Sequence, residues 1–412
     1  MAESVKNNPD SLNSNSADSS VSPQPDSDLG LYLHIPFCRS KCNYCAFFSS
    51  APNNDQQMDN YVEAICRHLE CGAGEIEGRK LCSIYLGGGT PSLLGISRLS
   101  RILETINSNF KINSNAEITL EANPESSSLE LFKALRQYGL NRISLGAQSF
   151  DDDQLAQLGR VHKSNDIKTA IDYARSAGLD NVSLDLIFAL PGQTLDSWRD
   201  TLSKALECQP DHLSAYGLTY EDGTPLKRLL DQGAITSVLD ETYIEMYDWS
   251  RNFLADNGWL QYEISNWSRP GKDSLHNQLY WRRDDYLAVG ASAHGMINSV
   301  RYAIISDAES YAGILHDACF DHDFWNAGLL EERVELSKDV MASDVMIFGL
   351  RLMEGVSVSC FKKRFGYSPL EKWGKVISRL EDNGLLEQNE DYIRLTYQAI
   401  PVSNEVFVHF LD

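Results

Sequence analysis

The stretch LYLHIPFCRSKCNYC, residues 31–45, combines a β-strand pattern with a cysteine motif and decides the fold. Residues 31–35 form a short apolar run that is typical of a buried strand. In the loop that follows, Cys38, Cys42 and Cys45 obey a Cys-x3-Cys-x2-Cys spacing. Thiolates this close together are soft ligands for zinc or for an iron-sulfur cluster. The stretch therefore predicts a metal-binding loop directly after the first strand.

Only three cysteines lie in this loop, and two interpretations remain open. A [4Fe-4S] cube that is held by three cysteines has one iron without a protein ligand, and an open coordination position is typical of reactive sites. A structural zinc site would need a fourth ligand from elsewhere, such as His34 or Cys82. The second interpretation corresponds to a zinc-stabilised binding module without redox chemistry.

Short aliphatic runs alternate with longer amphipathic stretches after this loop. Strands that are separated by helices pair in parallel through right-handed crossovers, so the alternation predicts an α/β fold. Periodicity alone does not distinguish an open, doubly wound sheet from a partial barrel. The predicted strands are residues 31–35, 83–86, 117–121, 142–146, 182–187 and 213–218, and the predicted helices are residues 59–69, 97–107, 128–138, 166–177 and 195–208.

Glycine and polar residues follow the ends of several predicted strands, where ligands gather in parallel α/β proteins. Residues 87–90, Gly-Gly-Gly-Thr, follow the second strand, Glu121 closes the third and Gln148 follows the fourth. Arg160 and Asp185 occupy comparable places. Taken singly, the glycines fit a tight turn equally well, and each polar residue fits a buried ion pair or a loop cap. Their shared position favours a ligand site.

Composition restricts the class of protein. The 412 residues carry a net charge of −22, which disfavours nucleic acid as a partner. Apolar runs are too short to span a bilayer, and no secretory leader opens the sequence, so we expect no transmembrane segment. Nine cysteines in this length are too sparse for a disulfide scaffold. We therefore expect a cytoplasmic protein with a metal site.

Four regions are expected along the chain. Residues 1–28 are rich in Ser, Asn, Asp and Pro and predict a disordered acidic tail. Residues 29–235 carry the strand-helix repeat, and residues 236–331 form a looser, aromatic-rich connecting region. Residues 332–412 combine helical patterns with a late strand, which predicts a winged-helix-like domain that serves structure or docking rather than DNA binding.

The chain resembles the radical SAM superfamily, whose members bind S-adenosylmethionine (SAM) on a [4Fe-4S] cluster. The resemblance begins with the cysteine spacing, with Tyr44 just before the third cysteine, and with the glycine turn. Within the superfamily, further motifs resemble the family of oxygen-independent coproporphyrinogen III oxidase (HemN) and the heme chaperone HemW. These motifs are YLHIPFC (32–38), EANP (121–124), SLGAQSF (144–150), DLI (185–187) and LPGQT (190–194).

The resemblance implies a fold and a set of cofactor contacts. The fold is a partial, TIM-like (β/α)6 barrel with a C-terminal winged-helix-like domain. Cys38, Cys42 and Cys45 would hold the [4Fe-4S] cluster, and an electron donor would reduce it. The implied SAM contacts are Tyr32, Tyr44, Gly88, Gly89, Thr90, Glu121, Gln148, Arg160 and Asp185.

Two features favour the chaperone group over the oxidase. The oxidase carries a fourth cysteine two positions beyond the third, where this chain has Phe47. The chaperone group shows the motif His-Asn-x2-Tyr-Trp, and residues 276–281 read HNQLYW. The resemblance therefore implies a chaperone that binds heme and passes it to an acceptor protein, with an oxidative decarboxylase of coproporphyrinogen III, or another radical reaction on a tetrapyrrole, as the alternative. His276 is the candidate heme contact, and His294 is a second one.

Overall fold

Six parallel strands form the centre of the computed structural model, which describes residues 29–76 and 78–411. The predicted tail, residues 1–28, lies outside the described residues. The strands pair in sequence order, and the predicted strand-helix alternation is confirmed. They are β1 (Leu29–Ile35), β2 (Lys80–Gly88), β3 (Lys111–Ala122), β4 (Arg142–Gln148), β5 (Val182–Phe188) and β6 (His212–Gly217).

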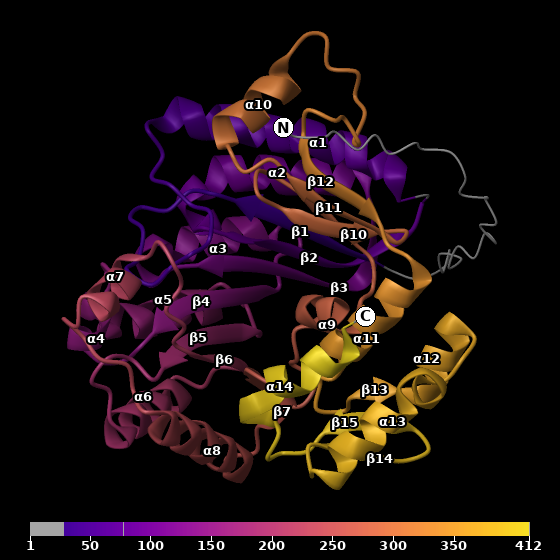
Figure 1. Cartoon of the computed structure of the whole chain (residues 1–412). Helices are drawn as coiled ribbons and strands as arrows, with labels where there is room; N and C mark the ends of the chain where they lie inside the picture. Colours follow the sequence, from indigo (N-terminus) through magenta and orange to yellow (C-terminus); the bar gives the residue numbers. More distant parts are fainter. Residues whose placement is uncertain (1–28, 77, 412) are drawn as a thin grey trace, which may run out of the picture.

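Helices that connect these strands form one layer along the sheet (Figure 1). Their apolar faces are buried, as on α2, where Leu99, Ile102 and Leu103 are all inaccessible or nearly so. Side-chain caps fix where several of them begin; Ser128 and Thr194 each accept a bond from a backbone N–H in the first turn. The helices are α1 (Asp55–Glu75), α2 (Gly95–Asn109), α3 (Leu129–Arg136), α4 (Asp152–Gln157), α5 (Ser164–Ser176) and α6 (Leu195–Glu207), with 3-10 turns η1 (Pro91–Leu94) and η2 (Pro124–Ser126).

The region predicted as a connection extends the same sheet at both ends. Beside β6 lie the antiparallel strands β8 (Asn266–Ser268) and β7 (Leu260–Glu263). Beside β1 the sheet continues through the parallel β9 and the antiparallel β10, β11 and β12 to give 12 strands. These short strands have no clear alternation, which explains why the sequence did not predict them. Their ranges are Tyr286–Val289 (β9), His294–Ile297 (β10), Val300–Ile304 (β11) and Leu330–Glu335 (β12).

The sheet curves without closing. Its order is β12-β11-β10-β9-β1-β2-β3-β4-β5-β6-β8-β7, and no pairing joins β7 to β12 within residues 29–76 and 78–411. The architecture is therefore the expected partial barrel. Four further helices follow β6 in the chain: α7 (Pro225–Asp231), α8 (Asp240–Asp256), α9 (Leu275–Arg282) and α10 (Ala308–His316).

The C-terminal residues form a helical unit with a small sheet, as the winged-helix-like prediction requires. Strands β13 (Val356–Ser357), β15 (Tyr392–Leu395) and β14 (Leu386–Gln388) pair in that order. The unit contacts the core through α9 and through β7, whose Tyr262 carbonyl accepts a bond from the Met353 N–H at 3.0 Å (Figure 1). Its helices are α11 (Lys338–Gly349), α12 (Val358–Phe365), α13 (Pro369–Asp382) and α14 (Ser403–Phe407), with 3-10 turns η3 (Ile400–Val402) and η4 (Val408–Phe410).

Across the part of the chain that is described, every helix is too short or too polar to cross a membrane.

Removal of the Tyr61 hydroxyl is expected to destabilise the fold. This buried hydroxyl donates to the His34 carbonyl at 2.9 Å and accepts from the Ala291 N–H at 2.8 Å, so it joins α1 to β1 and to the segment after β9. Tyr61→Phe leaves both groups unpaired, and we expect the free energy of unfolding in urea to fall by about 1–3 kcal/mol. Tyr173→Phe, at an exposed position on α5, is the control and should change little. Equal losses in both variants would contradict the assigned role.

Candidate functional site

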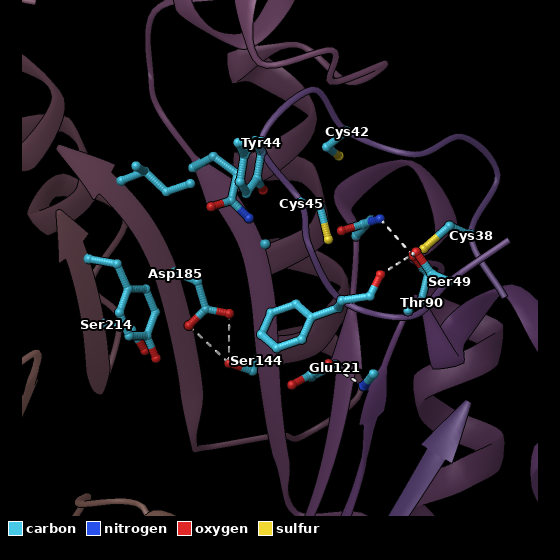
Figure 2. Close-up of a pocket in the computed structure, with 18 of the residues that line it drawn as sticks. Cys38, Cys42, Tyr44, Cys45, Ser49, Thr90, Glu121, Ser144, Asp185 and Ser214 are labelled. Atoms are coloured by element: carbon cyan, nitrogen blue, oxygen red, sulfur yellow. Dashed lines mark hydrogen bonds between the residues drawn. The ribbon is translucent and has the colours of Figure 1, made fainter. Parts of the chain in front are cut away.

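A cavity of about 840 Å³ lies between the inward faces of the central strands, the cysteine loop and α9. Figure 2 shows the three cysteines, Glu121 and Asp185 around this space. Every residue assigned to the cluster or to SAM from the sequence lines the cavity, and so does His276. His294 does not; it is exposed at the start of β10.

The cysteine loop is fixed at both ends and in its middle. The Cys38 N–H donates to the Ser50 carbonyl at 3.0 Å, which closes the loop on itself. In the middle, the Asn43 N–H donates to the Leu158 carbonyl at 2.9 Å, and its side chain donates to the Gln157 carbonyl at 2.9 Å. The loop is therefore held against the end of α4.

The three loop cysteines are free thiols that are half-buried at the cavity wall. The Thr90 hydroxyl donates to Cys38 Sγ at 3.6 Å, and Arg160 Nη1 donates to Cys42 Sγ at 3.4 Å. Burial raises the pKa of the Cys45 thiol. Hydrogen-bond donors and a guanidinium beside sulfur favour the thiolate form that binds metal. The donor set therefore fits a cluster ligated by cysteine.

The three cysteine sulfurs do not converge on a position where a single metal ion would bind. Among the residues described, no three His, Cys, Asp or Glu side chains converge as ligands of a single ion. A cube takes each thiolate on a different iron, so it does not require such convergence. Two residues were considered as a fourth zinc ligand. Cys82 lies near the start of β2, away from the loop. His34 uses both ring nitrogens in hydrogen bonds, one to Tyr32 and one to Phe48.

Two positions in the turn after β2 require glycine, because neighbouring atoms lie too close to leave room for a Cβ atom. A Cβ atom on Gly88 would lie 2.7 Å from the His34 ring, and the residue has φ of 110°. A Cβ atom on Gly89 would lie 2.7 Å from the Phe37 carbonyl oxygen. The turn therefore brings bare backbone to the cysteine loop and to the cavity wall.

Two carboxylates face the cavity from β3 and β5, the strands on either side of β4. Glu121 accepts bonds from the Tyr85 hydroxyl at 2.7 Å and from the Gly88 N–H at 3.1 Å, and burial raises its pKa to about 7. Asp185 accepts from the Ser144 hydroxyl at 3.1 Å, and burial raises its pKa as well. Both carboxylates are positioned by the protein and still present acceptor oxygens to a ligand.

Arg160 connects the cysteine loop to the ends of β3 and β4. Its Nη2 donates to Asn123 Oδ1 at 2.6 Å and to the Gly146 carbonyl at 2.9 Å, and Asn123 in turn donates to the Thr90 hydroxyl at 3.0 Å. Gln148, at the end of β4, has φ of 64°, an unusual value for a residue with a side chain. The strand ends are thus one hydrogen-bonded unit.

His276 lies at the other end of the cavity on α9 and is 1% exposed. Its Nδ1 is 2.7 Å from the Ser83 hydroxyl, and its Nε2 is 2.8 Å from the Tyr280 hydroxyl. Burial lowers its pKa to about 3, so the ring is neutral. Iron ligation through either nitrogen would first require one of these hydrogen bonds to break.

Several cavity residues that were not assigned from the sequence lie an even number of positions from one that was. On β4, Gly146 and Ser144 lie two and four positions before Gln148, and Asn123 lies two positions after Glu121. Because alternate residues of a strand face the same side, this spacing was an available signal. The other missed residues, from β4, β6 and α9, include Arg142, Ser214, Tyr216, Asn277 and Tyr280.

Comparisons with known proteins agree on one group. Residues 32–205 match the radical SAM superfamily, and residues 336–402 match the HemN C-terminal domain. The chain is 35% identical over 381 residues to the heme chaperone HemW of Bacillus subtilis, covering 92% of this chain and 98% of that protein. It is 32% identical over 406 residues to a mitochondrial radical S-adenosyl methionine domain-containing protein 1 of Bos taurus, covering 95% and 89%.

Among solved structures, coproporphyrinogen III oxidase (HemN) of Escherichia coli superposes with a TM-score of 0.80 at 23% identity. The match covers 95% of this chain and 92% of that one. At this identity the likeness establishes the shared fold, including the C-terminal unit.

Glu121 is expected to titrate near neutral pH. Burial raises its pKa from 4.5 to about 7. Protonation of Glu121 therefore stabilises the folded state fully below about pH 4.5, and this contribution is lost as the pH rises through 7. Burial raises the pKa of Glu263 to about 7 as well, so infrared titration of protein without SAM should show a protonated-carboxyl band with a midpoint about pH 7 to which both residues contribute, and Glu121→Gln should remove the part that belongs to Glu121.

Glu125→Gln is the matched control for this titration. Burial raises the pKa of Glu125, but contact with His162, a bond from its own backbone and the charge of Arg160 together outweigh burial and hold that pKa below its usual value. The band should therefore persist in Glu125→Gln. An unchanged band in Glu121→Gln would contradict the assignment.

Proposed function

We propose that this chain, which belongs to the heme chaperone HemW family of radical SAM proteins, binds heme and transfers it to an acceptor protein. Membership of the superfamily implies a [4Fe-4S] cluster and SAM. The observation that carries the proposal is the gathering of the predicted cluster, SAM and heme residues around one cavity, in a chain with Phe47 where the oxidase would have a fourth cysteine.

Cys38, Cys42 and Cys45 would hold the cluster. When bound, the cluster supplies an electron and one open iron position for SAM. The protein's own part is to fix the loop through Asn43 and to place the Arg160 guanidinium against Cys42 Sγ at 3.4 Å. This cation stabilises negative charge on the sulfur.

SAM would occupy the cavity beside the strand ends. The bare backbone of Gly88 and Gly89, with Thr90, suits the methionyl amine, and the Arg160 guanidinium suits the carboxylate. Glu121 and Asp185 have acceptor oxygens for the adenosine hydroxyls. The remaining proposed contacts are Tyr32, Tyr44 and Gln148.

Phe47 distinguishes the chaperone from the oxidase. Its side chain lines the cavity and is 71% exposed, which is unusual for phenylalanine and leaves an apolar ring available for contact. A cysteine at this position characterises the oxidase in the resemblance described above. At 23% identity, the likeness to the Escherichia coli oxidase shows the fold and says nothing of the activity.

Heme contact is assigned to the His276 motif. The His276 ring stacks on Tyr85 with centroids 5.0 Å apart, so the motif presents aromatic surface to the cavity. Iron ligation by Nε2 would require Tyr280 to turn away.

The acceptor protein and an electron donor for the cluster are the proposed partners. We propose a cytoplasmic location, although one relative is named as mitochondrial.

Loss of one loop cysteine is expected to abolish the cluster. Reconstituted anaerobically, the protein should show the broad visible absorbance of a [4Fe-4S] cluster, and Cys42→Ser should lose most of its iron and this absorbance because a ligand is gone. Cys82→Ser, outside the loop, is the matched control and should retain both. Full iron content in Cys42→Ser would refute the ligand set, as would zinc-loaded, colourless protein.

Heme transfer is tested with hemin and an apoprotein acceptor such as apomyoglobin. The protein should bind hemin in a 1:1 complex and release it to the acceptor, and His276→Ala should shift the visible spectrum of the complex if Nε2 ligates the iron. Tyr280→Phe, which frees Nε2 without removing it, should keep the wild-type spectrum.

Two outcomes would contradict this proposal. Absence of hemin binding would end it. Formation of protoporphyrinogen from coproporphyrinogen III, in stoichiometric amounts with SAM and reductant, would favour the oxidase instead. An unchanged spectrum in His276→Ala would remove only the ligand assignment.

A further inference from the structure

The cavity extends well below the proposed SAM contacts. Gln148 is the last residue of β4 and Arg142 is the first, and both line the cavity. At about 3.3 Å per residue, six residues of strand span roughly 20 Å. The upper end holds the cysteine loop and the glycine turn. The lower end is lined by Arg142 and by Asn277 and Tyr280 of α9.

Arg142 is a buried cation without a hydrogen-bonded anion. Its side chain is 2% exposed, and the nearest carboxylate oxygen, Glu117 Oε2, lies 3.9 Å from Nε. That distance is too long for a hydrogen bond, and Nε has no partner among the described residues. Burial of a charged guanidinium with an unpartnered Nε is costly.

The Glu117 carboxylate is already engaged by α9. It accepts bonds from the N–H groups of Leu275 and His276 at 3.1 Å each and lies 3.4 Å from the Ser274 hydroxyl. Its negative charge thus serves the first turn of α9, where backbone N–H groups attract anions. Glu117 therefore offsets the charge of Arg142 only in part.

The two histidines near Arg142 are neutral and hydrogen-bonded. His276 is bonded to Ser83 and Tyr280, and His212 Nδ1 and Nε2 lie 2.7 Å from the Ser183 hydroxyl and 2.8 Å from the Tyr262 hydroxyl. Burial lowers the pKa of both rings, and the charge of Arg142 lowers them further. Neither histidine supplies a negative charge.

The charge of Arg142 also acts on two other buried carboxylates of the cavity wall, where it opposes the rise in their pKa, but both form their hydrogen bonds with other residues. Asp185 is bonded to Ser144, and Glu121 is bonded to Tyr85 and Gly88. The guanidinium of Arg142 is therefore the group at the lower end whose hydrogen-bonding capacity is unused. A planar guanidinium binds a carboxylate through two parallel hydrogen bonds.

We infer that Arg142 binds a carboxylate of a ligand that enters the lower end of the cavity. Resting on the proposed function, this carboxylate is a propionate side chain of the tetrapyrrole. The stacked rings of Tyr85 and His276, with Tyr280 edge-on at 4.9 Å, give the same end an aromatic wall against which an apolar ligand packs. The side-chain amide of Asn277 is a further polar group there.

The test compares hemin with hemin dimethyl ester, whose propionates carry no charge. Wild-type protein should bind hemin on the order of 10-fold more tightly than the ester, the ratio expected for one charge-assisted pair. Arg142→Gln should weaken hemin binding by a similar factor and leave ester binding unchanged. Arg142→Lys should recover part of the difference, because it restores the charge but not the planar geometry.

Arg301→Gln, at an exposed arginine on β11, is the matched control and should retain the preference for hemin. Far-ultraviolet circular dichroism checks that Arg142→Gln folds; if it does not, the wild-type comparison of the two ligands decides. Equal affinity for hemin and ester would overturn the inference while the proposed function stands. Equal weakening of both ligands in Arg142→Gln would mean a structural role and would also overturn it. Absence of any hemin binding would overturn both.

Discussion

Side-chain alternation along six parallel strands is the constraint on which the site depends. On β4, Arg142, Ser144, Gly146 and Gln148 face the cavity, whereas Ile143, Leu145 and Ala147 are buried in the apolar core. A shift of one residue would exchange the two sets. Because parallel strands also end at one edge, the cysteine loop, the glycine turn and Arg160 meet there, and one sheet supplies both the upper and the lower end of the cavity.

A polar cavity inside a barrel is costly, and the structure offsets the cost group by group. Glu121 accepts hydrogen bonds from Tyr85 and Gly88, Asp185 accepts one from Ser144, and Arg160 donates to Asn123 and Gly146. Burial still raises the pKa of both carboxylates, because their hydrogen bonds offset the loss of solvation only in part. Incomplete pairing is what a site that receives polar ligands requires, since the ligand supplies the missing partners.

The lower end of the cavity is formed by residues far apart in sequence. Helix α9 is fixed at its first turn by Glu117 of β3, and its His276 ring is bonded to Ser83 of β2. The same region of the chain adds β7 and β8 to one side of the sheet and β9 to β12 to the other. The aromatic-rich segment that looked like a connection therefore completes both the sheet and the cavity, and it links them to the C-terminal unit through α11.

Sequence patterns determined the strand-helix alternation, the cysteine loop and the chemical identity of the strand-end residues, because each depends on neighbours within a few positions. The extra strands were not predicted, since pairs such as those of β9 with β1 form between segments without local periodicity. Only the tertiary structure decided the states of Glu121, His276 and Arg142. Burial raises the pKa of Glu121, Ser83 bonds His276 from 193 residues away, and the Nε of Arg142 has no partner. No local sequence pattern encodes these surroundings.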